Sequence, residues 1–496
     1  MKNKLLQGTF VLLGASIILR CLGFVYQIFV VRYAGTEALG ILNMTMPFYM
    51  LLVVLATMGF PVAISKLVAE FVSSDRQDNI AQMMKTAFLF VLVLSLLCAL
   101  FAYFFMPYIF HLLQTDLRVR QCFLVLIPGI ILVPLCSIMR GYFQGKQQMQ
   151  YPAASQILEQ LIRVLCGVFL LVVISPPDVL SLAMSLAVAA MMGELGGCLL
   201  LWFYYWKSKS NSSAPMGKKW LKPLLSLGIP VTGTRLTSTI DMAIEASMVP
   251  LCLIAIGYNT SQAASVYGQF SGVAISLLTI PTVLTSALST SLIPAISSAS
   301  SNQEKDALQQ YCQQALAITW MFSLPIIFTL YLYGEELGQF LFHIDGIGEM
   351  MRWLSFGAIF LYFGQIVVGI LQGLGMTRTV FINNFFGSAA KLIGMYYCIR
   401  ILNLGSIGIA GGMIIGYGLQ CLLNISALGM CVSIRLPWKD AFLPLINSVL
   451  MIIHLQMWET ILPPNHGGFL FLRFVLAAIG YFIIEACTGH LKRLLK

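Results

Sequence analysis

The stretch GYFQGKQQMQYPAASQILEQLIR, residues 141–163, shares its skeleton with GILQGLGMTRTVFINNFFGSAAK, residues 369–391. In both stretches a Gly-x-x-Gln-Gly turn is followed, eighteen residues after its last glycine, by a basic residue inside an apolar segment. One offset of 228 relates five pairs of positions: Gly141 and Gly369, Gln144 and Gln372, Gly145 and Gly373, Gln156 and Asn384, Arg163 and Lys391. A repeat this long, with a cation at the same place in each copy, predicts two homologous half-molecules, as in many secondary transporters.

The composition places the chain in a bilayer. It is 59% hydrophobic and 10% charged, with a mean hydropathy of +0.87, whereas about 25% of the residues of soluble domains are charged. A spanning helix needs roughly 20 apolar residues, and the sequence contains about fourteen such runs. We therefore predict an all-α polytopic membrane protein with two pseudo-symmetric six-helix lobes and two further C-terminal helices.

The predicted boundaries follow the repeat and one basic loop. Residues 207–222 contain five lysines among Ser, Asn, Pro and Gly, a composition typical of a linker. We predict an N-terminal lobe at 1–208, a basic cytoplasmic linker at 209–222 and a C-terminal lobe at 223–431. Two extra transmembrane helices and a cytoplasmic tail then occupy 432–496.

The distribution of Lys and Arg predicts the orientation. With the N-terminus cytoplasmic, nineteen basic residues fall in the inner segments and five in the outer loops, which is the bias that sets membrane topology. We predict a multi-pass protein of the cell membrane with both termini cytoplasmic. The net charge of +10 then reflects topology and contact with anionic membrane lipids, and nucleic acid is not an expected partner.

The cysteines and loops argue against metal or catalytic chemistry. Twelve cysteines are scattered without a C-x-x-C pair and are predicted to be small buried hydrophobes. We expect no cofactor, no metal site and no catalytic residues, so the chain is predicted not to be an enzyme. A polytopic glycosyltransferase was the alternative, but it would need a substantial extramembrane loop or a metal-binding acidic motif, and neither is evident.

The predicted fifth helix carries a polar stripe. Gln156, Glu159, Gln160 and Arg163 occur at i, i+3, i+4 and i+7, so they share one face of a helix. Such a face in an apolar helix must meet a cavity or other polar groups. The matching stripe of the second half, which keeps the cation and loses the acid, consists of Asn384, Gly387, Ser388 and Lys391.

Other polar residues lie at membrane depth in the first helix of each half. Arg20 and Gln27 belong to the first helix, while Arg235, Asp241 and Glu245 belong to the seventh. An intramembrane arginine is costly unless it faces water, a partner or the protein interior, so Arg20 is predicted to line a cavity or, alternatively, to form a structural salt bridge. The lone acid Glu194 of the sixth helix is predicted to be structural.

These cations predict a central hydrated chamber that binds an anion. The predicted substrate-binding residues are Arg20, Gln27, Gln156, Glu159, Gln160, Arg163, Arg235, Asn384 and Lys391. Three acids, Glu159, Asp241 and Glu245, would balance the charge or bind a coupling cation. Because arginine binds phosphate bidentately and stays charged when partly desolvated, a lipid-linked sugar pyrophosphate is the predicted cargo.

The second helix ends in a proline motif that contributes to a family resemblance. Pro61 follows Gly59, and Pro294 in the eighth helix is predicted to be its counterpart. The chain resembles the stage V sporulation protein B group over essentially its whole length, through Arg20 to Phe24, Gly59 to Glu70, Arg140 to Gly145 and the stripe from Gln156 to Arg163. That group belongs to the polysaccharide-transporter branch of the multidrug/oligosaccharidyl-lipid/polysaccharide (MOP) flippase superfamily. The resemblance implies two six-helix lobes, alternating access and movement of lipid-linked peptidoglycan precursor for spore cortex synthesis.

A weaker resemblance extends to the lipid II flippase family, whose first helix also has an arginine before Leu-Gly-Phe, matched here by Arg20. This chain has Tyr26 and the region of Met50 where that family has further arginines, so the resemblance does not extend to lipid II as the cargo. The alternatives are a cation-coupled multidrug exporter on the same scaffold and a non-transporting scaffold for cell-wall synthesis enzymes, which are candidate partners.

Overall fold

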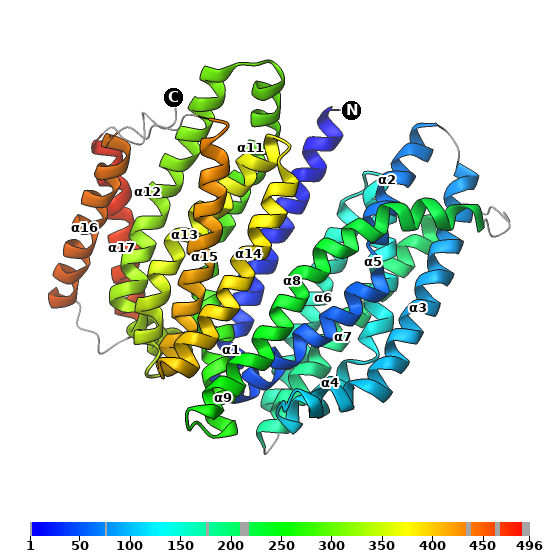
Figure 1. The fold of residues 1–496 in the computed structure, drawn as a ribbon, viewed down its shortest axis with the longest axis horizontal. Coiled ribbons are helices and arrows are strands. Elements are labelled where there is room, and N and C mark those ends of the chain that lie inside the picture. Colours follow the sequence, from blue (N-terminus) through cyan, green and yellow to red (C-terminus); the bar gives the residue numbers. More distant parts are fainter. Residues whose placement is uncertain are drawn as a thin grey trace. The chain divides into compact units, whose positions relative to one another are not determined.

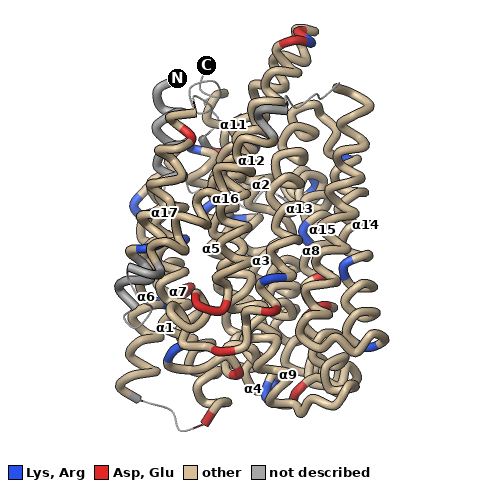
Figure 2. The backbone as a smooth tube through the Cα atoms, turned by 90° about the vertical axis from the view of Figure 1, so that its left-hand side faces the viewer, with Lys and Arg blue, Asp and Glu red and all other residues tan. Residues whose placement is uncertain are grey.

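A computed structural model describes residues 2–74, 77–174, 178–208, 218–432, 438–461 and 467–488. Every regular element in these residues is helical, which confirms the predicted fold class. Charged residues are sparse along the backbone (Figure 2), as expected for helices that contact lipid. The chain forms two compact units, residues 1–272 and 273–496.

Among its described residues the first unit contains nine α-helices, whose arrangement is drawn in Figure 1. Short π- or 3-10 segments occur at Leu170–Ile174, Lys218–Trp220 and, across the unit boundary, Gln269–Ala274. The α-helices are α1 (Lys2–Thr57), α2 (Phe60–Ser73), α3 (Gln77–Leu112), α4 (Leu117–Leu126), α5 (Gly129–Gly145), α6 (Gln150–Phe169), α7 (Val179–Ser208), α8 (Leu221–Ala255) and α9 (Thr260–Gly268).

The described part of the second unit contains the other eight α-helices, with π-helical segments at Gly338–Phe342 and Tyr397–Ile401. Near its C-terminal end, α16 and α17 lie beside α12 (Figure 1), and the Tyr481 hydroxyl of α17 donates to the Met321 carbonyl of α12 at 2.7 Å. The α-helices are α10 (Ile275–Thr279), α11 (Thr282–Ser301), α12 (Lys305–Leu337), α13 (Gly348–Gly373), α14 (Thr377–Tyr396), α15 (Gly405–Gly429), α16 (Trp438–Ile461) and α17 (Gly467–Cys487).

Helix α1 is too long to be one membrane span. Its 56 residues would extend about 84 Å at 1.5 Å per residue, against about 30 Å of hydrocarbon. Gly35 breaks the helix with φ 77° and ψ 170°, a conformation that glycine adopts without steric cost. The apolar region before Gly35 and the one after it are therefore separate spans.

Length and hydropathy alone identify nine candidate spans among the described residues, or ten if the bent pair α4–α5 counts as one. Joining helices that continue one another, and dividing α1 at Gly35, gives fourteen successive runs within the described chain. These runs are 2–34, 36–73, 77–112, 117–145, 150–174, 179–208, 221–255, 260–301, 305–342, 348–373, 377–401, 405–429, 438–461 and 467–487. Their number agrees with the sequence prediction.

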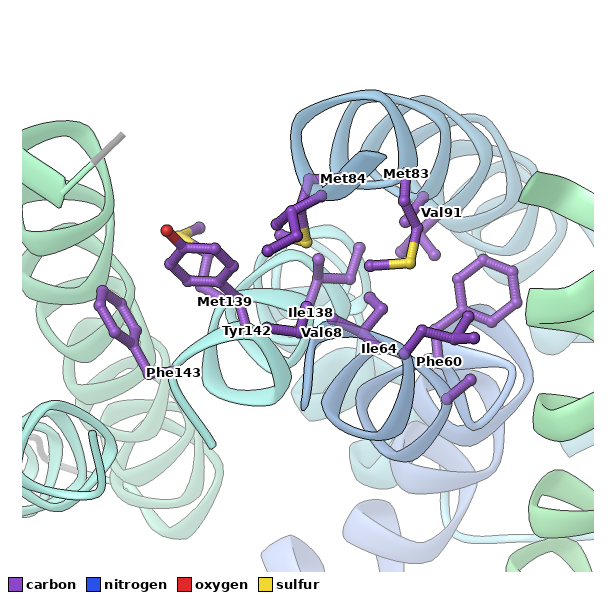
Figure 3. Packing of buried hydrophobic residues seen from close by; sticks show 14 of the residues in the cluster. Phe60, Ile64, Val68, Met83, Met84, Val91, Ile138, Met139, Tyr142 and Phe143 are labelled. Carbon is purple, nitrogen blue, oxygen red and sulfur yellow. The ribbon is translucent and has the colours of Figure 1, made fainter. Parts of the chain in front are cut away.

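One apolar core of the first unit joins α2, α3 and α5. Phe60 and Ile64 of α2 lie with Met83 of α3 and with Ile138 and Phe143 of α5, and all five are fully buried (Figure 3). Burying such side chains stabilises the fold by about 1.5–3 kcal/mol each, and in a membrane protein close van der Waals packing supplies much of the contact energy. This core fixes α5. The Gly-x-x-Gln-Gly segment, predicted to be a turn between helices, is the helical C-terminal end of α5.

The glycines of that segment are required by a close approach of α5 to α2. A Cβ atom on Gly141 would lie 2.5 Å from the carbonyl oxygen of Pro61, and one on Gly145 would lie 2.6 Å from that of Ser65. Real Cβ atoms are not found at such distances from backbone atoms. The GxxxG spacing therefore serves helix packing, as predicted from the sequence.

The second copy packs in the same way. A Cβ atom on Gly369 of α13 would lie 2.9 Å from the carbonyl oxygen of Ser289 in α11, and one on Gly373 would lie 3.0 Å from that of Ile293. These partners follow those of the first copy by 228 residues, the offset found in the sequence. The repeat therefore extends to interhelix contacts.

This register corrects one prediction about the prolines. Pro61 contacts Gly141, and the residue that contacts Gly369 in the second copy is Ser289. Pro294, five residues further along, is therefore not the structural counterpart of Pro61. Leu55 and Leu288 each precede a proline by six residues. This shared spacing is misleading because two prolines in similar apolar helices can be aligned without occupying the same packing position.

The α1–α9 contact within the first unit also follows the repeat. Gly40 and Gly268, which are 228 residues apart, contact each other's helix so closely that a Cβ atom on either would overlap a backbone carbonyl. Asn43 Nδ2 donates to Ser271 Oγ at 3.0 Å, again across 228 residues. Equivalent residues that contact one another lie beside a local pseudo-two-fold axis, the symmetry expected of duplicated transporter halves.

Candidate functional site

The polar stripe predicted in the fifth span lies on α6, and three of its members interact. Arg163 Nη2 lies 2.8 Å from Glu159 Oε1, an i,i+4 ion pair, and Arg163 Nη1 donates to Gln160 Oε1 at 3.4 Å. Both contacts follow from the helical period, which places residues three and four apart on the same face. Gln156 is half-buried on the same helix.

Residues of two neighbouring helices complete the site. Arg140 Nη2 of α5 lies 2.7 Å from Glu159 Oε2, and Glu194 Oε1 of α7 lies 3.6 Å from Arg163 Nη2. Glu159 therefore bridges two guanidinium groups, whereas Glu194 makes one longer contact. We call Arg140, Glu159, Arg163 and Glu194 the ion-pair cluster.

Small residues on α7 allow this helix to reach the stripe. A Cβ atom on Gly193 would lie 2.7 Å from the Glu159 carbonyl oxygen and 3.0 Å from the Arg163 Cβ. One on Gly197 would lie 3.1 Å from the Glu159 Cβ. The GxxxG spacing of α7 thus forms a smooth surface on which the charged face of α6 packs.

The cluster is largely shielded from solvent. The side chains of Glu159 and Glu194 are 14% and 12% exposed, and that of Arg163 is 28% exposed. Tyr49 of α1 is 1% exposed, and its hydroxyl interacts electrostatically with the charges of all three. Four buried polar atoms in and beside the cluster make no hydrogen bond among the described residues: the Tyr49 hydroxyl, Glu194 Oε2, Arg140 Nε and Arg163 Nε. Charged groups in such surroundings are costly unless paired.

The second unit replaces this cluster with amide groups. Lys391 of α14 is 9% exposed and packs on Gly416 of α15, where an added Cβ would lie 2.9 Å from the Lys391 Cα. Gly387, equivalent to Glu159 in the repeat, packs under the side chain of Gln420. Gln420 Nε2 donates to Asn384 Oδ1 at 2.7 Å.

The remaining predicted residues do not join the cluster. Arg20 on α1 and Arg235 on α8 are exposed, and Asp241 and Glu245 on α8 are half-buried. The amide of Gln27 donates to the Gly272 carbonyl at 3.1 Å, so it has a structural partner. Convergence of these residues with Asn384 and Lys391 of the second unit stays a prediction.

Sequence reasoning missed two members of the cluster. From the sequence, Arg140 directly precedes the Gly141 segment and is counted among the basic residues of the inner loops, and Glu194 is predicted to be a lone structural acid. A useful signal was present: Glu194 directly follows Gly193 on the small-residue face of α7. Its partner, 31 residues away on α6, can only be found from packing.

Two sequence families match the chain. The family described as Polysaccharide biosynthesis protein matches residues 5–300, and the MatE family matches residues 238–397. Stage V sporulation protein B of Bacillus subtilis (strain 168) is 28% identical over 88% of this chain and 86% of its own length. Lipid II flippase MurJ of the same organism is 25% identical over 79% of this chain and 77% of its own.

Solved structures share the fold. Lipid II flippase MurJ in an inward closed conformation aligns with a TM-score of 0.75 at 16% identity, over 98% of this chain and all of that chain. An inward-facing multidrug resistance MATE family transporter of the MOP superfamily aligns with a TM-score of 0.67 at 16% identity, over 83% of this chain and 96% of that chain. The chain is a multi-pass membrane protein with the MOP fold, and its resemblance to stage V sporulation protein B is confirmed. By the match that covers residues 5–300, it belongs to the polysaccharide biosynthesis protein family.

Proposed function

We propose that the protein is a flippase that moves an anionic lipid-linked saccharide across the cell membrane by alternating access. The lobes predicted at 1–208 and 223–431 rock about a chamber between them, while the two extra helices at 432–496 remain outside the repeat. The lipid tail stays in the bilayer and the headgroup passes through the chamber. The names of two relatives, stage V sporulation protein B and sporulation protein YkvU, support a role in sporulation, and a peptidoglycan precursor of the spore cortex is the cargo that we propose for that role.

The observation that carries this proposal is the exposure of two arginines in the middle of apolar helices. Arg20 and Arg235 are both exposed on α1 and α8, which pack together within the first unit. An arginine at this depth is tolerated where it faces water, a partner or the protein interior, and a guanidinium group that is exposed as well can bind phosphate bidentately. Arg163, 28% exposed, adds a third cation, and Lys391 is the proposed contribution of the second half.

The amides of Gln27, Gln156, Gln160 and Asn384 would hydrogen-bond the saccharide, and Glu159, Asp241 and Glu245 would balance the arginines. The name of the relative MurJ supports a lipid-linked cargo. This chain differs in sequence from the lipid II flippase family around Tyr26 and Met50, so the saccharide need not be that of lipid II.

Reconstitution into proteoliposomes tests the proposal. A fluorescent saccharide on a short isoprenoid diphosphate is added, and access of a membrane-impermeant quencher to the headgroup is followed with and without a membrane potential. The wild-type protein should accelerate flipping, whereas Arg20→Ala and Arg163→Ala should abolish it while remaining folded and monodisperse. The matched control is Arg352→Ala, which removes an exposed arginine at the start of α13.

Three results would contradict the proposal. Flipping at the wild-type rate by both alanine variants would show that Arg20 and Arg163 do not bind the cargo. Transport of a cationic dye without flipping would favour a multidrug exporter. A wild-type protein that moves neither cargo would favour a scaffold for cell-wall synthesis enzymes.

A further inference from the structure

The two acids of the ion-pair cluster are unequally paired. Glu159 receives both short contacts, at 2.7 Å from Arg140 and 2.8 Å from Arg163. The ion pair of Glu194 is the longer 3.6 Å contact with Arg163, its side chain also interacts with Glu159, and its Oε2 is buried without a hydrogen bond. A buried carboxylate with one weak contact is the charge that the cluster holds least favourably.

The neighbours of Glu194 come from all the helices that pack around it. Arg140 of α5 and the Glu159–Arg163 pair of α6 are the charged groups that act on it. The titratable neutral groups are Tyr49 of α1, Cys136 of α5 and Cys198 of α7. The nearby carboxylate of Glu159 repels the ionised form of Glu194, and the two guanidinium groups attract it.

We propose that Glu194 is a proton-binding site whose occupancy controls the affinity of Arg163 for the anionic cargo. With both acids ionised, two arginines and two carboxylates give the cluster a net charge of zero. A proton that bonds to Glu194 removes one negative charge, so the cluster becomes +1. The 3.6 Å attraction to Glu194 is then lost. Arg163 stays paired with Glu159 at 2.8 Å, but the cluster now has one positive charge without a counter-charge, which attracts a phosphate.

The surroundings favour a proton over a metal cation. A metal ion bound by Glu194 would lie beside the guanidinium groups of Arg140 and Arg163, which would repel it at short range. A proton bonds covalently to the carboxyl oxygen, adds almost no volume and cancels the charge. The neutral acid can also donate a hydrogen bond to Glu159 or to the Tyr49 hydroxyl.

Protonation of Glu194 and binding of the anion then strengthen each other. Because the protonated cluster is +1, the anion binds more tightly at low pH, and by reciprocity a bound anion increases the proton affinity of Glu194. Couplings of this kind usually change affinity about 5- to 150-fold. This inference rests on the proposed function for the identity of the anion, but not for the protonation itself.

Infrared spectroscopy of the full-length protein in lipid vesicles tests the protonation directly. The carbonyl-stretch band of a protonated carboxylic acid is recorded across a pH titration. One titrating band should disappear in Glu194→Gln, remain at a shifted position in Glu194→Asp, and be unchanged in Glu70→Gln, which alters an exposed acid at the end of α2. In Glu159→Gln the band should appear only at lower pH, because both arginines then attract Glu194.

Binding of farnesyl diphosphate, measured on the same samples, tests the coupling. The wild-type affinity should rise at least about 5-fold from high to low pH, and that of Glu194→Gln should be high and independent of pH. No titrating band, or a band that persists unchanged in Glu194→Gln, would overturn the proton site. A pH-independent wild-type affinity would overturn the coupling. A titrating Glu194 band without binding of the probe at any pH would support the proton site while refuting the anionic cargo of the proposed function.

Discussion

The helix pairs α6–α7 and α14–α15 are equivalent in the repeat. They pack closely in both copies, but the large side chain and the glycine that faces it are exchanged between the two helices. In the first unit the large side chain, Glu159, is on α6 and packs on Gly197 of α7. In the second unit α14 has Gly387 at the equivalent position, and the large side chain, Gln420, projects from α15. Both pairs stay close because each contact has one glycine.

The exchange changes the chemistry while preserving the packing. Glu159 brings a charge that pairs with Arg140 and Arg163, whereas Gln420 brings a neutral amide that bonds to Asn384. The first unit therefore contains a cluster whose charge can change, and the second contains a hydrogen-bonded pair whose charge is fixed. Duplicated halves can thus keep one fold and assign ion chemistry to one of them.

The largest effect is expected when the bridge of the first unit is removed. Glu159→Ala leaves Arg140 and Arg163 without their shortest partner, and breaking a buried pair costs about 3–5 kcal/mol. We expect a loss near the lower value, because the side chain of Arg163 is 28% exposed. Unfolding of the purified protein in mixed micelles measures this loss of stability. The matched change in the second unit is Gln420→Ala, which we expect to cost less than half as much. Equal losses of stability in the two variants would show that the ion pairs of Glu159 stabilise the protein no more than the amide hydrogen bond of Gln420 does.

A smaller effect is expected from making the second unit resemble the first. Gly387→Glu alone forces a side chain against the Gln420 Cβ, which lies 2.7 Å from an added Cβ, and overpacking of this kind costs about 1–3 kcal/mol. Adding Gln420→Gly should recover most of that loss, because the glycine then lies opposite the new carboxylate, four residues before Lys391. Melting curves of the single and double variants measure the recovery. A double variant less stable than Gly387→Glu would contradict the exchange of large and small residues.

The smallest difference in stability is expected between alanine substitutions at Gly141 and at Gly369, the first glycines of the two Gly-x-x-Gln-Gly segments. An alanine at Gly141 meets only backbone of Pro61, with the carbonyl oxygen at 2.5 Å, so α5 must move away from α2. At Gly369 the first contact is the Ser289 hydroxyl, which can rotate once its bond to the Gln365 carbonyl is broken. The nearest backbone atom is the Ser289 carbonyl oxygen at 2.9 Å. Overpacking of about 1–3 kcal/mol is offset by about 1 kcal/mol of helix propensity. In the same unfolding assay we expect Gly141→Ala to lose about 1 kcal/mol and Gly369→Ala to lose less, because its backbone contact is longer. The reverse order would contradict the inferred difference in rigidity.

Much of this molecule was determined by sequence alone. Apolar runs of spanning length decide that the chain is helical and lies in a membrane, because no backbone group can remain unpaired in hydrocarbon. The offset of 228 identifies the repeat, and the spacing of Glu159 and Arg163 places them on one helical face, since both signals depend only on position along the chain.

The tertiary structure alone decided which partners that face meets. Arg140 and Glu194 join Glu159 and Arg163 from α5 and α7, and Pro61 has Ser289 as its counterpart through glycine contacts. Helical period is a local property that sequence spacing reveals. The distance between side chains on different helices depends on how closely the backbones pack, which the positions of small residues on both helices determine together.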